Sequence, residues 1–299
     1  MELLVASTVV LGMPLLLAAL GGLIAERTGV LNLGLEGLML AAAFVTAWVA
    51  GSGRPLGLAL VIGVALGGAC GLALGWIVVV ARADQVVTGI GLNLVVLGLT
   101  GYLFGIVGAD GFTTGAIAEV RVPGLAEIPW AGQLFDQPWL AYVGYALVPV
   151  AAVVIFRTGL GIRMRACGEY AEGARASGVD VVRARLVAMA VSGALCGLAG
   201  AFLVLADTHK FVHNVTNGRG YIALAVIILG RWRPLGALGA AALFAYAQGL
   251  DLYAQARDLD LPLQLVQALP YALTLLAAAV LGRRARPPAE EGRPLLLSR

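Results

Sequence analysis

Long apolar runs constrain this chain more than any other feature of its sequence. A helix needs about 20 apolar residues to cross the hydrocarbon core of a bilayer. Eight runs of approximately that length recur along the chain: 3–24, 35–50, 56–80, 86–107, 140–156, 186–205, 235–250 and 263–281. A ninth run, 221–229, crosses only if the polar, glycine-containing stretch 211–220 contributes. The sequence therefore predicts an all-α, polytopic transmembrane helix bundle of about nine spans, within a range of eight to ten.

Composition supports a membrane protein. Apolar residues make up 60% of the 299 residues and charged residues 12%, against roughly 45–50% and 25% in soluble domains. So little polar surface cannot cover a water-soluble globule. This excludes a soluble enzyme, a nucleic-acid binder and a disordered chain. The first run follows Met1-Glu2 without a basic residue and is longer than a signal-peptide core, so we expect it to be the first span.

The basic residues indicate an orientation. If the long polar loop 157–185 is cytoplasmic and the chain crosses nine times, 15 of the 20 basic residues lie on the cytoplasmic side. An excess of Lys and Arg marks cytoplasmic loops. The sequence thus predicts a multi-pass protein of the inner (plasma) membrane, with its N-terminus outside and its C-terminus in the cytoplasm. We expect one transmembrane domain over 1–282 and a disordered cytoplasmic tail over 283–299.

The sequence shows no catalytic, metal or cofactor site. Lys210 lacks the glycine loop of a phosphate-binding motif. Ser192 lies inside an apolar run without the signature of a nucleophile or a nearby base. Asp207, His209 and His213 suggest a metal site, but such a polar cluster is more typical of a solvated loop. We therefore expect no enzyme activity, no metal and no cofactor.

Polar residues interrupt the apolar runs at a few places. In segment 26–37, Asn32 is placed to cap a helix, and Glu36 falls in the first turn, where the helix dipole favours a carboxylate. Alternatively, both line a central pathway, because transporters place glycine-interrupted segments along cavities. Thr88 and Asn93 either form interhelical hydrogen bonds or face that pathway.

A second candidate broken helix begins at Gly218-Arg219-Gly220. Its N-terminus would suit an anionic or hydroxylated solute. Asn217 precedes it directly and completes the set of candidate pathway residues.

The loop 157–185 contains a short polar helix. Glu172 lies three and four residues before Arg175 and Ala176, and Gly178 ends the pattern. The segment is too polar to enter lipid, and its small residues would permit close docking by another protein. The alternative is a solvated loop that faces lipid headgroups.

Glycines recur at four-residue spacing in three of the runs: Gly67, Gly71 and Gly75; Gly101 and Gly105; Gly193 and Gly197. Such spacing lets helix backbones approach closely within a membrane. Close packing within one bundle is the main interpretation, and a dimerisation face is the alternative.

Two motifs resemble those of a known family. The segment Glu26-Arg-Thr-Gly-Val-Leu-Asn-Leu-Gly-Leu-Glu-Gly37 resembles the signature of permease subunits of bacterial ABC importers for nucleosides, which belong with the ribose-type sugar and branched-chain amino acid permeases. Arg165-Ala-Cys-Gly-Glu-Tyr-Ala-Glu-Gly-Ala-Arg-Ala-Ser-Gly178 is similar to the cytoplasmic coupling helix of that family. Segments 192–201 and 220–236 also match, and the resemblance covers about 20–282.

The resemblance implies a working partnership. Two such permeases, identical or different, line a pathway, each docks a cytoplasmic ATP-binding subunit, and an extracytoplasmic solute-binding protein delivers the solute. Membrane lipid surrounds the chain, and no nucleic acid binds. The coupling residues it implies are Gly168, Glu169, Tyr170, Ala171, Ala174, Arg175 and Gly178. Nucleosides are the expected substrate; a sugar, a branched-chain amino acid or, from a different class, an ion-coupled carrier are the alternatives.

Overall fold

The computed structural model describes residues 2–107, 113–124, 126–128, 132–256, 272 and 286–293. Within them the chain is almost entirely helical. The first four helices are α1 (Glu2–Glu26), α2 (Leu35–Gly51), α3 (Leu56–Gly75), which a π-helical turn, Trp76–Val80, continues, and α4 (Gln85–Val107). The next four are α5 (Trp139–Arg157), α6 (Gly159–Glu169), α7 (Ala171–Ala176) and α8 (Val181–Phe202), which a second π-helical turn, Leu203–Asp207, extends. They are followed by α9 (Arg219–Leu229) and α10 (Pro234–Ala256).

The predicted runs correspond closely to these helices. Five of the described helices are long and apolar enough to cross a membrane: Leu4–Glu26, Leu56–Val80, Gln85–Val107, Trp139–Arg157 and Val181–Asp207. Leu35–Gly51 and Arg219–Leu229 are apolar but shorter. The run 263–281 lies outside the described residues. The all-α membrane class is therefore confirmed, whereas the count of nine spans stays a prediction.

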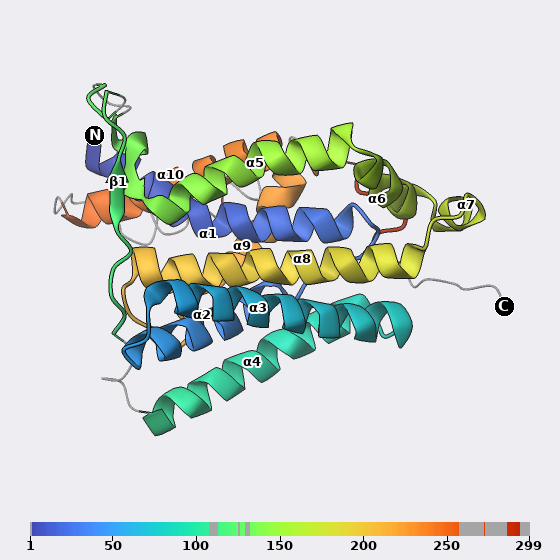
Figure 1. The fold of residues 1–299 in the computed structure, drawn as a ribbon, viewed down its shortest axis with the longest axis horizontal. Coiled ribbons are helices and arrows are strands. Elements are labelled where there is room, and N and C mark those ends of the chain that lie inside the picture. The colour runs from blue at the N-terminus through green and yellow to red at the C-terminus, as the bar shows by residue number, and fades with distance from the viewer. Residues whose placement is uncertain are drawn as a thin grey trace.

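The helices run roughly side by side along the long axis of the molecule (Figure 1). α1 lies between α5 and α8, and α6 and α7 project from one end of the bundle. The opposite end carries a two-stranded antiparallel sheet of β1 (Glu119–Arg121) and β2 (Asp136–Pro138), in which Val120 pairs with Gln137. We call these the α7 end and the hairpin end.

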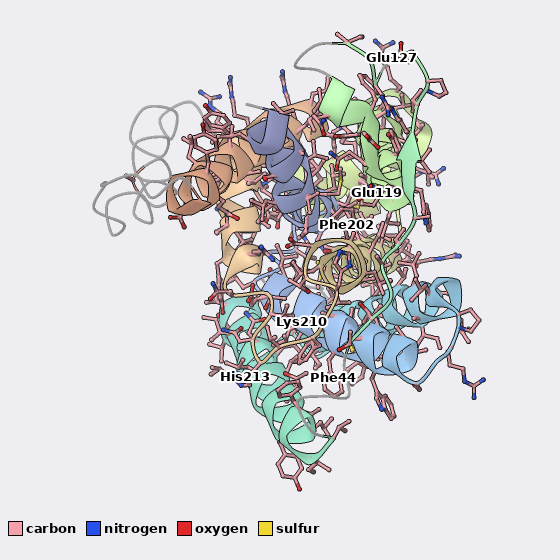
Figure 2. The ribbon with its side chains drawn as sticks, turned by 90° about the vertical axis from the view of Figure 1, so that its left-hand side faces the viewer. Phe44, Glu119, Glu127, Phe202, Lys210 and His213 are labelled. Atoms are coloured by element: carbon pink, nitrogen blue, oxygen red, sulfur yellow. The ribbon has the colours of Figure 1, made fainter. Side chains whose placement is uncertain are left out.

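At the hairpin end, the segment between α8 and α9 passes over the ends of the helices. Figure 2 shows Lys210 and His213 on this segment, and Glu119 on the hairpin. A Cβ on Gly101 of α4 would lie 2.7 Å from the His213 ring, so the imidazole packs on α4. Among the described residues, no cluster of His, Cys, Asp and Glu is suited to hold a metal ion.

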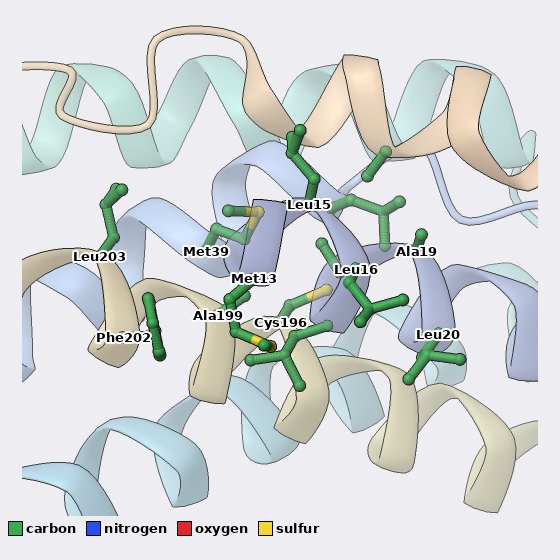
Figure 3. Packing of buried hydrophobic residues seen from close by; sticks show 14 of the residues in the cluster. Met13, Leu15, Leu16, Ala19, Leu20, Met39, Cys196, Ala199, Phe202 and Leu203 are labelled. Carbon is green, nitrogen blue, oxygen red and sulfur yellow. The ribbon is translucent and has the colours of Figure 1, made fainter. Parts of the chain in front are cut away.

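The core forms around α1. Its residues from Leu15 to Leu20 are almost completely buried, and Figure 3 shows them packed against Met39 of α2 and Cys196 of α8. α4, in contrast, exposes many of its large apolar side chains, including Leu94 and Val95. In a membrane, lipid covers such a face without cost, because lipid chains are as apolar as the side chains.

Glycine spacing brings α3 and α8 into close contact. A Cβ on Gly71 would lie 2.8 Å from Cα of Gly193, and one on Gly197 would lie 2.9 Å from Cα of Val64. The backbones therefore touch where side chains are absent. For these two motifs, packing within one bundle is the correct interpretation. The third motif is different, since a Cβ on Gly105 would meet nothing within 4 Å.

Candidate functional site

Two interruptions of the helices meet inside the bundle. Between α1 and α2 the chain runs through the irregular segment 27–34, and between α8 and α9 it runs through 208–218. Backbone groups without helical partners must find other partners when they are buried. The hydrogen bonds of both segments therefore show how the site is held.

The Glu36 side chain joins the two interruptions. One carboxylate oxygen accepts hydrogen bonds from the Thr216 hydroxyl (2.5 Å) and the Gly218 N–H (2.8 Å). The other accepts from the Gly220 N–H at 2.6 Å. A negative charge at the first turn of α9 satisfies donors that the helix leaves unpaired and interacts favourably with its dipole. Glu36 thus caps α9 from a different helix.

Glu36 occupies the N-terminus of α9, the position at which the sequence predicted that a solute binds. Besides the two N–H groups bonded to Glu36, those of Arg219, Tyr221 and Ile222 donate to carbonyl oxygens of Thr216 and Gly218. Every N–H from Gly218 to Ile222 therefore has a partner within the chain.

Asn93 of α4 holds the first interruption against α9. Its amide NH2 donates to the Leu33 carbonyl (2.9 Å) and the Tyr221 hydroxyl (3.0 Å), and its oxygen accepts from the Gly37 N–H (2.8 Å). Gln85 similarly accepts from the Leu31 N–H at 2.7 Å. Both side chains replace the helical partners that segment 27–34 lacks.

Asn32 is completely buried and binds α8. Its NH2 group donates to the Ser192 hydroxyl (2.9 Å), and its oxygen accepts from the Gly34 N–H (3.0 Å). The N-cap position of α2 is Gly34 and not Asn32, because the chain stays irregular for two more residues. Glu36 does lie in the first turn of α2, as expected.

The structure brings four of the five candidate pathway residues into one region. Asn32, Glu36 and Asn93 hold the backbone there, and Asn217 precedes the capped turn with an exposed side chain. Thr88 lies apart from them, with its hydroxyl bonded to the carbonyl of Asp84, the residue directly before its own helix.

Sequence reasoning missed Thr216 and Tyr221 as partners in this region. Thr216, two residues before Gly218, is the one available signal, since a Thr close to a helix start is a typical capping residue. Arg219 forms a salt bridge with Asp207 (3.3 Å), which links the two ends of the second interruption.

The predicted coupling loop is largely helical. α6 and α7 together cover most of 159–176, and Gly178 ends α7 with φ of +82°, a conformation that favours glycine. The expected short polar helix corresponds to α7, and the extended backbone at Tyr170 separates it from α6, which the sequence did not predict.

Gly178 ends α7, and the other six coupling residues divide into two groups. Ala171 and Ala174 are buried, and a Cβ on Gly168 would strike the Arg27 carbonyl. These three residues hold α6 and α7 in place. The other side chains face outward: Glu169, Tyr170 (61% exposed) and Arg175. Figure 1 shows α7 projecting beyond the other helices, so this outward surface is accessible to a partner.

Residues 286–293 bind the α7 end. The Glu290 N–H donates to the Gly168 carbonyl (2.8 Å), and the Gln85 side chain donates to the Arg293 carbonyl (3.2 Å). For these eight residues the expected disorder is not observed, because backbone hydrogen bonds and the burial of Pro288 fix them. Burial raises the pKa of the Glu291 carboxyl to about 7, although nearby Arg27 opposes the shift.

A polar cluster lies beneath this tail. The Arg27 guanidinium donates to the Trp232 carbonyl (2.6 Å and 3.0 Å), and the Trp232 ring N–H donates to the Glu26 carboxylate (2.6 Å). These contacts tie the end of α1 to the link between α9 and α10. A continuous set of contacts therefore joins the α7 end to α9, which Glu36 caps at its other end.

Comparisons with known proteins agree with this architecture. The protein-family model for the permease component of the branched-chain amino acid transport system matches residues 4–278 of this chain. The guanosine ABC transporter permease protein NupQ of Bacillus subtilis is 34% identical over 99% of this chain and 97% of its own length. The nucleoside ABC transporter permease protein NupC of Lactococcus lactis is 30% identical over 97% of this chain and 96% of its own.

A third relative differs in the substrate that its name states. The putative glucose ABC transporter permease protein TsgC13 of Haloferax volcanii is 36% identical over 83% of this chain and 76% of its own length. No solved structure matches the chain significantly.

Proposed function

The chain belongs to the permease family of the branched-chain amino acid transport system and is a permease subunit of an ABC importer. On this premise, we propose that it forms the translocation pathway of a nucleoside importer. Two relatives that cover nearly its whole length are named for guanosine and for nucleosides. A separate subunit hydrolyses ATP, and the permease couples that hydrolysis to the movement of the solute.

The structural observation that supports an ATP-driven permease is the outward surface of the α7 end. Arg175 is exposed on α7, a polar helix that projects beyond the spans, and Tyr170 is exposed directly before it, while Ala171 and Ala174 fix α7 from within. A rigidly held helix with an exposed arginine, preceded directly by an exposed aromatic residue, is suited to dock a protein partner. We infer that the cytoplasmic ATP-binding subunit docks there.

This assignment sets the orientation of the multi-pass protein in the inner membrane. The α7 end is cytoplasmic, and the hairpin end, where α1 begins, faces outward. The tail residues 286–293 lie at the α7 end, in agreement with a cytoplasmic C-terminus. The excess of arginine in the loops at this end supports the same orientation. An extracytoplasmic solute-binding protein and a second permease, identical or different, complete the assembly.

The pathway lies beside the joined interruptions. Asn32, Glu36 and Asn93 hold the backbone that shapes it, and the exposed Asn217 faces it. Movement of α7 passes through Arg27 and Trp232 to α9 and then to the Glu36 cap. Coupling requires two states of this connection, which the ATP-binding subunit and the solute favour differently.

Substitutions on the outward surface test the docking assignment. Tyr170→Ala and Arg175→Glu should each lower co-purification of the ATP-binding subunit and reduce ATP-dependent uptake more than tenfold, as for a central interface residue. Arg54→Glu, an exposed arginine at the hairpin end, is the matched control. Full co-purification with both α7 variants would show that the subunit docks elsewhere.

Uptake measurements test the substrate. Cells that carry the complete transporter should take up labelled guanosine only while ATP is available, and adenosine or cytidine should compete. Competition by glucose or ribose alone would favour a sugar permease, the function named for the Haloferax volcanii relative. Uptake that survives ATP depletion but stops when the proton gradient collapses would contradict the ATP-driven mechanism.

A further inference from the structure

An unassigned groove lies beside the α7 end. It has a volume of about 770 Å³ and opens where α5, α6 and α8 meet next to the end of α1. Its walls are mainly aliphatic, with Val154 from α5, Leu160 from α6 and both Val187 and Val191 from α8. Figure 1 shows α5 and α8 on either side of α1, with α6 at the α7 end of the bundle.

The depth of this groove matches one leaflet. Along α8 and its N-cap it reaches from Asp180 to Val191, twelve residues or roughly 16 Å of helix. One leaflet contributes about half of the ~30 Å hydrocarbon core. Val187 and Val191 are exposed on the protein surface at this depth. A soluble partner does not enter the hydrocarbon region, whereas lipid acyl chains fill it, so an acyl chain fits these residues.

Charged side chains lie at the mouth of the groove. Arg163 of α6 and Arg183 of α8 both line it, and both are exposed. Neither guanidinium forms a salt bridge within the part of the chain that the structure describes. Asp180 also lines the mouth, but its carboxylate accepts the Arg183 backbone N–H (3.0 Å) as the cap of α8. Two cations and one capping anion leave a net positive charge.

We propose that the groove binds an anionic phospholipid of the cytoplasmic leaflet, with one acyl chain between α5 and α8 and the phosphate between Arg163 and Arg183. An apolar cleft with a basic mouth at the cytoplasmic surface has the chemistry of such a site. A phosphate diester carries one negative charge, which matches the net charge of the mouth. The choice of leaflet rests on the orientation proposed above.

The bound lipid has a structural consequence for coupling. Ser177, Gly178 and Val179, which link α7 to α8, line the same groove. A lipid chain packed there supports the link, and its removal leaves α7 less firmly positioned. We therefore expect anionic lipid to strengthen the coupling of ATP hydrolysis to transport without contacting the solute.

Competition between lipids tests the binding site directly. The full chain, purified with its partner subunits in phosphatidylcholine, is titrated with phosphatidylglycerol, and bound lipid is counted by native mass spectrometry. Arg163→Gln and Arg183→Gln should each weaken retention about fivefold, the contribution of one basic residue near a membrane surface, and the double variant about 25-fold. Arg157→Gln, an exposed arginine at the end of α5 that does not line the groove, is the matched control.

A second variant separates the acyl site from the charge at its mouth. Ala184→Phe fills the groove while both arginines remain, and it should also reduce retention. Glycerol phosphate, which has the headgroup charge but no acyl chain, should not displace the lipid.

Several outcomes would overturn the proposal. These are unchanged retention in the double variant, an equal loss in Arg157→Gln, displacement by glycerol phosphate, and equal retention of phosphatidylcholine. Loss of the ATP-binding subunit from the double variant at unchanged lipid retention would assign the surface to that subunit instead. Lipid retention is measured without uptake, so the result can be interpreted even if the nucleoside assignment fails.

Discussion

The Glu36 carboxylate and the Gly220 N–H lie 2.6 Å apart, although 184 residues separate them in the sequence. This contact lets α9 begin inside the bundle, since a carboxylate from α2 pairs the donors that a helix start leaves exposed. No residue larger than glycine fits at position 220, because a Cβ would fall on the Glu36 backbone. The capping of α9 therefore requires both residues.

Glu36→Gln should destabilise the protein. The amide keeps one acceptor oxygen, but its NH2 group faces N–H donors, so a charged hydrogen bond worth about 1.5–3 kcal/mol is lost. Thermal unfolding in detergent measures the change, and Glu119→Gln on the exposed strand β1 is the control. Stability equal to the original protein with reduced uptake would instead give Glu36 a direct role with the solute.

Asn93→Ala should cost more than Tyr221→Phe. The first change leaves the Gly37 N–H and the Leu33 carbonyl without their partner, at about 1–3 kcal/mol for each buried group. The second removes one hydrogen bond and leaves the other two of Asn93 intact. The same unfolding measurement compares them, and the reverse order would show that Asn93 does not hold segment 27–34.

Gly67→Ala should loosen the contact between α3 and α8. The added Cβ would lie 2.8 Å from Cα of Gly197, and overpacking of this kind costs about 1–3 kcal/mol. Gly105→Ala is the matched control, because it belongs to a motif with the same spacing but its Cβ would meet nothing. It should be neutral or slightly stabilising. A similar loss of stability in both variants would contradict the packing argument.

Docking of the tail should weaken as the pH rises. Glu291 has a pKa of about 7 when docked, against 4.5 in its ordinary state, so the docked tail binds more protons between these values. Docking is then strongest below about pH 4.5 and declines as the pH rises through about 7. The groups that face Glu291 are Glu26 at the end of α1 and Arg27 after it.

A spin label at Ala289→Cys, with Cys70 replaced by Ala, measures this change. The mobile fraction should increase between about pH 5 and pH 8. Glu291→Gln should remove the dependence, whereas Glu127→Gln at the hairpin end should leave it unaltered. A dependence that persists in Glu291→Gln would assign the titration to another group.

The sequence by itself determined the helices and their class. Apolar runs predicted the bounds of α1, α2, α4 and α5 to within two residues, because a helix that crosses a membrane remains predominantly apolar along its length. Glycine spacing also predicted close packing for the helices α3 and α8, although not that they pack on each other. The motifs of 26–37 and 165–178 indicated the family, which the comparisons then confirmed.

Only the tertiary structure decided what the polar residues do. Local sequence offered Asn32 and Glu36 either as caps or as pathway residues, and it gave no sign that Glu36 caps a helix far along the chain. It also could not separate Ala174, which is buried, from Arg175, which is exposed. Hydrophobic periodicity indicates whether a residue faces lipid or the core. A hydrogen bond across 184 residues instead depends on how separate helices pack.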